Sequence, residues 1–108
     1  MDSQDQIYDL LIIGTGPAGY TASIYASLYK VSNIIIGSMP GGLAAAAFDV
    51  CNFPSEESIP GRELMKKMED NAKNLGAKIV MGEVAGIVKE NDTFTVKTSY
   101  AGDFLAKS

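Results

Sequence analysis

The stretch "LIIGTGPAGYTA", from Leu11 to Ala22, decides the fold of this protein. In it an apolar run ends in three glycines, Gly14, Gly16 and Gly19, and small residues follow at once. In such a turn the first glycine allows the sharp bend from strand to helix. The second lets a pyrophosphate reach the backbone, and the third lets helix and strand pack closely. The spacing therefore predicts a dinucleotide-binding turn.

The residues around this turn have the order of a βαβ unit. Ile7 to Ile13 is apolar and branched, which predicts a strand buried on both faces of a parallel sheet. Pro17 suits the first turn of the helix that follows. A stripe of small residues on that helix is expected to face the sheet: Gly19, Ser23 and Ala26. Asn33 to Ile36 predicts a second buried strand, and the length from Ile7 to Ile36 fits one crossover.

The rest of the chain adds a loop, a helix and more strands. Ser38 to Pro60 is rich in proline and glycine and predicts a loop, in which Ala44 to Ala47 favour a helical turn too short to form alone. Arg62 to Leu75 predicts an amphipathic helix, and Lys78 to Met81 a third parallel strand. Three further segments predict an antiparallel meander: Val84 to Lys89, Thr93 to Thr98, and Asp103 to Ala106.

These elements predict an α/β protein. We expect a Rossmann-like βαβαβ half with a parallel sheet, followed by the antiparallel meander. Residues 1–6 form a polar leader and residues 7–108 one incomplete domain. On the first helix, Tyr20, Tyr25 and Tyr29 are expected to pack rather than to act as catalytic acids.

Composition excludes several classes of function. The net charge is −4 and the pI is about 4.6, which argues against nucleic acids and against anionic membrane surfaces as partners. No apolar run approaches the roughly 20 residues that span a bilayer. Residues 1–6 resemble neither a signal peptide nor a transit peptide, so a cytoplasmic location is expected.

The sequence contains few residues that could bind a metal or carry out thiol chemistry. The chain has no histidine and a single cysteine, Cys51, so it has no internal disulfide, no CxxC pair and no Cys/His zinc site. No metal site and no catalytic residue are predicted. We expect Cys51 to be a small buried side chain.

The usual acid for a ribose is missing. In dinucleotide-binding folds an Asp or Glu about 20 residues after the turn binds the ribose hydroxyls. Here Ile36, Gly37 and Ser38 occupy that place, and no arginine stands there to hold a 2′-phosphate. Ser38 offers a hydroxyl instead. The missing acid weakens the interpretation of this chain as a classical NAD-binding domain. The segment "CNFP" (Cys51 to Pro54) also opposes that interpretation.

Three motifs together resemble a known family. "DLLIIGTGPAGYTASIYAS" (Asp9 to Ser27), "PGGL" (Pro40 to Leu43) and "CNFP" (Cys51 to Pro54) are similar to the start of thioredoxin reductase and related flavoproteins. The resemblance covers about residues 7 to 107. It implies the FAD-binding domain of an enzyme whose second domain binds NADPH and carries a redox CxxC. In that family electrons pass from NADPH through the flavin to a disulfide.

The resemblance also implies roles for residues of this chain. The FAD pyrophosphate would be held by the first glycine turn: Gly14, Gly16, Pro17, Ala18 and Gly19. Gly37 and Ser38 would lie near the adenosine ribose, and Val84 would make backbone contacts beside the adenine. A second group would line the path to the flavin: Gly41, Gly42 and Leu43. Asn52 would bind near the isoalloxazine ring.

This chain departs from the family on the flavin side. Leu43 stands where the family commonly has Gln, Ala44 to Ala47 where it has a threonine-rich run, and Cys51 where it often has a carboxylate. In the family the meander leads into a strand that ends in Ala-Thr-Gly and returns beside the first strand. Here the chain stops at Ser108, which predicts a truncated domain that retains FAD weakly.

Truncation has an expected physical consequence. Without the returning strand, residues 8–13 become a bare apolar edge, which invites pairing with another chain. We therefore expect a homo-oligomer, or pairing with the complementary remainder of the flavoprotein. Two functions stay open. The first is a piece of a thioredoxin reductase-like enzyme that binds FAD or another ADP-containing nucleotide and is inactive alone. The second is a non-catalytic module, natural or engineered, that self-associates.

Overall fold

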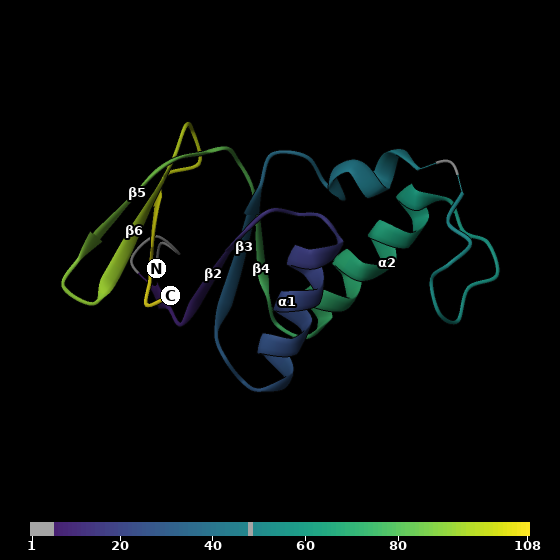
Figure 1. Ribbon diagram of the computed structural model, residues 1–108. Coiled ribbons are helices and arrows are strands. Elements are labelled where there is room, and N and C mark those ends of the chain that lie inside the picture. The colour runs from purple at the N-terminus through teal and green to yellow at the C-terminus, as the bar shows by residue number, and fades with distance from the viewer. Residues whose placement is uncertain (1–5, 48) are drawn as a thin grey trace.

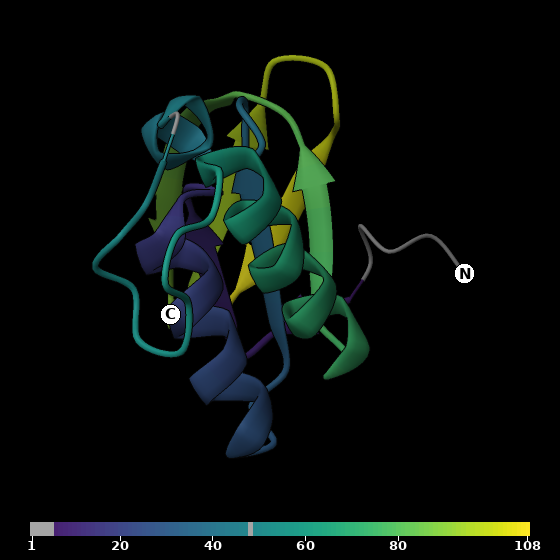
Figure 2. The same ribbon diagram turned by 90° about the vertical axis from the view of Figure 1, so that its right-hand side faces the viewer.

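The computed structural model describes residues 6–47 and 49–108 and arranges them in three layers (Figure 1). The middle layer is a parallel sheet with the order β2 (Leu10–Ile13), β3 (Asn33–Gly37), β4 (Lys78–Met81). Helices α1 (Pro17–Leu28) and α2 (Gly61–Asn74) cover one face of it, as the turned view in Figure 2 also shows. A second sheet covers the other face, with the order β1 (Ile7–Tyr8), β7 (Asp103–Ala106), β6 (Thr93–Thr98), β5 (Val84–Glu90). The predicted α/β class and the antiparallel meander are both confirmed.

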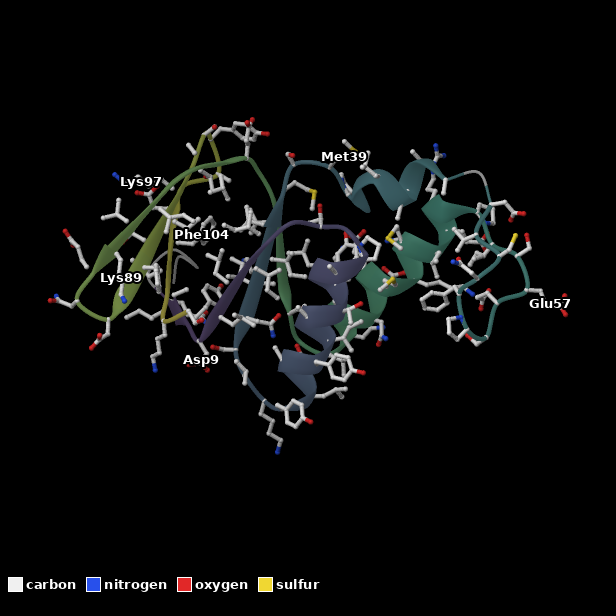
Figure 3. All side chains as sticks on the ribbon, in the orientation of Figure 1. Asp9, Met39, Glu57, Lys89, Lys97 and Phe104 are labelled. Carbon is white, nitrogen blue, oxygen red and sulfur yellow. The ribbon has the colours of Figure 1, made fainter. Side chains whose placement is uncertain are left out.

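Strand β3 is the centre of the molecule. Ile34 and Ile36 point to one side and belong to the cluster between the two sheets, together with Phe104 of β7 (Figure 3). Ile35 points to the other side and packs under the helices with Tyr20 of α1. Because side chains alternate along a strand, a strand with apolar residues at every position must have cover on both faces. The prediction of a buried parallel strand is confirmed here.

Helix α1 faces the sheet through its small residues. Ser23 is fully buried, and its hydroxyl donates to Asn33 Oδ1 at 2.5 Å. The amide of Asn33 in turn donates to the hydroxyl of Ser27 at 2.9 Å. Small side chains let the helix lie close enough for these bonds. The expectation for the tyrosines is correct only for Tyr20, because Tyr25 and Tyr29 are exposed.

The first predicted strand is divided in two. Ile7 and Tyr8 form β1 and pair with β7, whereas β2 begins at Leu10 and pairs with β3. Between them Asp9 turns away from both ladders. Its backbone N–H donates to the Ser32 hydroxyl at 2.9 Å, and its carboxylate accepts from the same hydroxyl at 3.1 Å. These bonds to Ser32, 23 residues away in the chain, take the place of a ladder bond at Asp9, so that one apolar run contributes to two sheets.

The edge formed by residues 8–13 is not bare along its whole length, so that part of the prediction is wrong. Strand β7 runs parallel to β1, and the residues after it continue beside the first strand. Lys107 N–H donates to Tyr8 O at 2.9 Å, and Leu11 N–H donates to Ser108 O at 2.9 Å. The chain's own C-terminal residues therefore cover the edge as far as Leu11.

The predicted loop from 38 to 60 contains a short helix, η2 (Gly42–Ala46). Tertiary contact makes up for its low intrinsic stability, because Gly61 N–H at the start of α2 donates to Ala47 O at 2.9 Å. An antiparallel bridge between Val50 and Ile59 then closes the loop of residues 51–58. Cys51 in this loop is exposed, so the expectation of a buried cysteine is wrong.

Helix α2 is amphipathic as predicted and begins one residue earlier than expected. Leu64, Met65 and Ala72 are buried. Leu75, which was expected on the same face, lies after the helix and is 38% exposed. Within the described part of the chain, no helix has both the length and the apolar character that crossing a membrane requires.

Candidate nucleotide-binding site

The carboxyl ends of the three parallel strands meet at one edge of the sheet. Gly14 N–H, just after β2, donates to Ile36 O of β3 at 2.8 Å. Gly82 N–H, just after β4, donates to Gly37 O at 2.8 Å. These bonds bring the first glycine turn, the end of β3 and the start of β5 at Val84 to the same edge. In open α/β sheets ligands bind at this edge.

Gly14 and Gly19 must be glycines because of the backbone conformation and packing of this turn. Gly14 has φ +123°, which residues with a Cβ rarely adopt. A methyl group on Gly19 would overlap Gly14 O and would lie 3.6 Å from the side chain of Ile12. The sharp turn and the close packing of α1 on β2 therefore account for Gly14 and Gly19.

Gly16 is different, because nothing in the described part of the chain requires a glycine there. Its φ is −94°, which any residue can adopt. A Cβ on Gly16 would find only one atom within 4 Å, Gly41 O at 3.9 Å. The bare α-carbon of Gly16 thus faces open space at the mouth of α1. A ligand that needs to touch the backbone has room there and would lose it if a side chain were present.

The N-terminus of α1 has no side-chain cap among the residues that the structure describes. Gly16 is the N-cap and makes no side-chain capping bond, and the first turn holds no acidic residue. Helix α2, in contrast, has Glu63 in its first turn. The first helical bond of α1 joins Tyr20 N–H to Gly16 O at 3.1 Å, so the amides of Ala18 and Gly19 precede the helical ladder. Unpaired amides and the helix dipole favour an anion at this end.

A second glycine turn lies against the first. Pro40 and Gly41 form the corner of a turn closed by Gly42 N–H, which donates to Met39 O at 3.0 Å. Gly41 has φ +79°, as position i+2 of a type II turn requires. A Cβ on Gly42 would lie 3.4 Å from the α-carbon of Gly16. The structure therefore brings the "PGGL" segment beside the first turn.

Thr15, which the sequence does not single out, connects the two turns. Its side chain is buried, although it stands between two glycines in a turn. Its hydroxyl donates to Met39 O at 2.6 Å. It also fills the space over Gly37, where a Cβ would lie 2.8 Å from Thr15 Cβ. The only signal in the sequence is a polar residue between glycines, which predicts exposure.

The residues expected on the flavin side are more scattered. Leu43 lies in η2 and is 87% exposed. Asn52 is exposed in the loop of residues 51–58, which extends away from the helices with Glu57 toward its tip (Figure 3). A hollow of about 640 Å³ lies between η2 and this loop, with Asp49, Ser58 and Arg62 among its lining residues. The structure does not bring Asn52 to the glycine turns.

The described residues offer little acid–base or metal chemistry. Burial raises the pKa of Tyr20 above its ordinary value, further from neutral pH. Within residues 6–47 and 49–108, no three His, Cys, Asp or Glu side chains are grouped so that they could hold a metal ion.

Comparison with known sequences points to one family, although no protein-family model matches the chain. It is 42% identical over 96 residues to the thioredoxin reductase of Bacillus subtilis, an alignment that covers 88% of this chain and 30% of that protein. It is 37% identical over 99 residues to NADPH-dependent thioredoxin reductase 3 of Arabidopsis thaliana, covering 86% of this chain and 19% of that protein. The chain thus spans less than a third of the length of these relatives.

Comparison with solved structures agrees. The thioredoxin reductase of Streptococcus pyogenes superposes with a TM-score of 0.88 at 36% identity, over 99% of this chain and 34% of that one. The enzyme of Lactococcus lactis gives a TM-score of 0.87 at 34% identity, over 94% of this chain and 33% of that one. Both sequence and fold therefore match one portion of these proteins.

Proposed function

We propose that this chain binds the ADP part of FAD. It is homologous to the N-terminal portion of thioredoxin reductases and has the fold of part of their FAD-binding domain. One observation carries the proposal. Gly16 is a glycine that its own chain does not need, and its bare backbone faces open space at an uncapped helix N-terminus. That arrangement fits a diphosphate.

Each part of the nucleotide has candidate partners. The pyrophosphate would accept hydrogen bonds from the amides at the mouth of α1, Ala18 and Gly19, while Pro17 has no N–H to offer. Gly14 shapes the turn, and Gly16 leaves room for the phosphate oxygens. Gly41 and Gly42 supply the facing wall of the site. FAD, when bound, supplies two-electron redox chemistry.

The adenosine end would lie along the strand ends. Gly37 ends β3, and Ser38 follows it with an exposed side chain whose hydroxyl is available to the ribose. Val84 begins β5 at the same edge and offers backbone groups to the adenine. On the flavin side Leu43 and Asn52 are exposed and apart, so we expect little additional affinity from the isoalloxazine ring.

A titration with three nucleotides tests the proposal. The chain is titrated with FAD, ADP and NADPH, with flavin fluorescence for FAD and calorimetry for all three. We expect FAD and ADP to bind with similar affinity. Gly16→Ala should weaken both at least tenfold, because its methyl group takes the place of the phosphate. The matched control is Gly86→Ala, since a Cβ there also meets nothing within 4 Å but lies in β5. Equal affinity for FAD and ADP in the unsubstituted chain, Gly16→Ala and Gly86→Ala would overturn the proposal.

We propose further that these residues form part of a thioredoxin reductase-like flavoprotein that uses NADPH, and that they are inactive alone. The chain has one cysteine and therefore no CxxC pair to pass electrons to. A single unpaired cysteine also suits a reducing compartment, which favours the cytoplasm. With FAD added, we expect no NADPH-dependent reduction of a disulfide substrate above the rate of free flavin. Turnover would contradict this.

A second candidate function is self-association at the remaining strand edge. Leu10 N–H and Gly14 N–H both bond toward β3, so the intervening odd-numbered amides, Leu11 and Ile13, face the other way. The Leu11 N–H donates to Ser108 O, whereas Ile13 lies past the end of this pairing and is 53% exposed. Beside it is a groove of about 200 Å³ whose lining includes Phe94.

We propose that a strand from a second copy pairs there, at the place that the remainder of a longer flavoprotein would otherwise take. Light scattering after size exclusion at tens of micromolar decides whether a dimer forms. In a dimer the amide of Ile13 should exchange as slowly as that of Leu11. A monomer with a fast-exchanging Ile13 amide would rule the second candidate out.

A further inference from the structure

We propose that Thr15 is a positioning residue that holds the Met39–Gly42 turn closed beside the first glycine turn, and so sets the affinity of the site for a nucleotide diphosphate. This inference rests on the proposed function. The bond between the Thr15 hydroxyl and Met39 O is a tether between segments 24 residues apart in the chain.

The burial of Thr15 is the first argument. Only 3% of the residue is exposed, and its side chain lies in a slot that exists because residue 37 is a glycine. A Cβ on Gly37 would come within 2.6 Å of Thr15 Cγ2. Packing therefore fixes the side chain and aims its hydroxyl at Met39. A hydroxyl held in this way loses little conformational entropy when it forms its bond.

The second argument is the position of the acceptor. Met39 O closes the second turn by accepting from Gly42 N–H at 3.0 Å, and it accepts from Thr15 Oγ1 at 2.6 Å as well. The hydroxyl thus bonds to the one carbonyl that defines the turn. Loss of the hydroxyl would leave the turn held by a single bond between its own ends.

The third argument connects the tether to the ligand. Gly41 and Gly42 have no side chains with which to hold this segment, although the backbone of Gly41 packs closely against Ala45 and Met65. Yet it comes close to Gly16, whose α-carbon would lie 3.4 Å from a Cβ on Gly42. A diphosphate at the mouth of α1 would therefore meet a wall whose position depends on Thr15.

Three variants test the inference. Thr15→Val keeps the shape and removes the hydroxyl, whereas Thr15→Ser keeps the hydroxyl. The matched control is Thr98→Val, because the Thr98 hydroxyl makes a similar tether, to Gly102 O at 2.5 Å, in the turn between β6 and β7. Hydrogen exchange of the Gly42 amide is measured without nucleotide, and the affinity for ADP is measured by calorimetry.

In Thr15→Val we expect the Gly42 amide to exchange at least tenfold faster and ADP to bind about fivefold more weakly, as for loss of one hydrogen bond. Thr15→Ser should restore both within twofold, and Thr98→Val should change neither. Unchanged exchange in Thr15→Val would overturn the tether. Faster exchange with unchanged affinity would overturn its effect on binding.

The failure of the proposed function is distinguishable from the failure of this inference. If the unsubstituted chain binds no ADP, the proposed function fails and the claim about affinity fails with it. Exchange at Gly42, which needs no nucleotide, would still decide whether Thr15 holds the turn. Circular dichroism of each variant checks that it folds.

Discussion

Gly19 packs directly on the carbonyl group of Gly14: a methyl group on Gly19 would overlap the carbonyl oxygen and would lie 3.0 Å from the carbonyl carbon. Helix α1 and the turn just after β2 therefore touch backbone to backbone at this point. We expect Gly19→Ala to lower the free energy of unfolding by about 2 kcal/mol, as overpacking of a close contact does. Urea denaturation measures this, with Gly86→Ala as the matched control. Equal unfolding midpoints for Gly19→Ala and the unsubstituted chain would contradict the packing role.

Gly16→Ala should behave in the opposite way. A Cβ at Gly16 lies 3.9 Å from its one neighbour, Gly41 O, and the backbone there is not left-handed. We expect stability to stay within about 1 kcal/mol, because a weaker N-cap is offset by a less flexible unfolded chain. Thermal unfolding without nucleotide checks this. A large loss of stability would mean that the lost affinity of this variant reflects unfolding rather than the site.

Gly37 and Thr15 should be energetically coupled. Gly37→Ala places a methyl group within 2.8 Å of Thr15 Cβ, and we expect it to cost about 1–3 kcal/mol of stability. In a Thr15→Ala background the overlaps with Thr15 Oγ1 and Cγ2 are removed and only the close contact with Cβ remains, so the same substitution should cost at least about 1 kcal/mol less. A double-mutant cycle of urea denaturation curves measures the coupling. Strict additivity would show that the two side chains do not share this space.

Asp9 should contribute an acid-sensitive part of the stability. Hydrogen bonds from the backbone and side chain of Ser32 hold its pKa below the ordinary 3.8, with a smaller contribution from Lys107. A lowered pKa means that the folded state favours the carboxylate, so the contribution is complete above the unfolded pKa. It is lost as the pH falls through the folded pKa.

The measurement for Asp9 is a comparison of urea midpoints between the unsubstituted chain and Asp9→Asn from pH 7 down to pH 3. The difference should be greatest at neutral pH and should shrink below pH 4. Lys107→Ala tests the weaker ion pair, whose Nζ lies 3.6 Å from Asp9 Oδ1. A difference that grows on acidification would contradict the assigned direction of the pKa shift.

Cys51 should react in the native protein. It is exposed in the loop of residues 51–58 and its sulfur lies 3.5 Å from Asp49 Oδ2. We expect a thiol reagent to label one equivalent without denaturant, and none in Cys51→Ala. Labelling should not unfold the chain, because the loop is closed by the Val50–Ile59 bridge rather than by Cys51. A thiol that reacts only in denaturant would show that this loop is buried in solution.

The local elements could be predicted because their causes are local. Isoleucines 34 to 36 predict a strand with two covered faces, and the glycine spacing predicts a strand-to-helix turn. Both are present. The division of the first strand at Asp9 was not predictable, since it depends on Ser32, 23 residues away. The exposure of Tyr25 and Cys51 was missed for the same reason, because burial depends on what the fold places opposite a side chain.

The sequence by itself determined the α/β class and the glycine turn from strand to helix, because alternation, helical spacing and the lack of side chains at Gly14 and Gly19 act within a few residues. The motif assigns a pyrophosphate to the second glycine, Gly16, and only the tertiary structure shows that this position has open space in front of it. Gly14 and Gly19 are explained by a backbone angle and a backbone contact, whereas Gly16 faces open space. Only the tertiary fold could bring Thr15 to Met39. The two residues are 24 positions apart, so their hydrogen bond can form only once the intervening chain has folded.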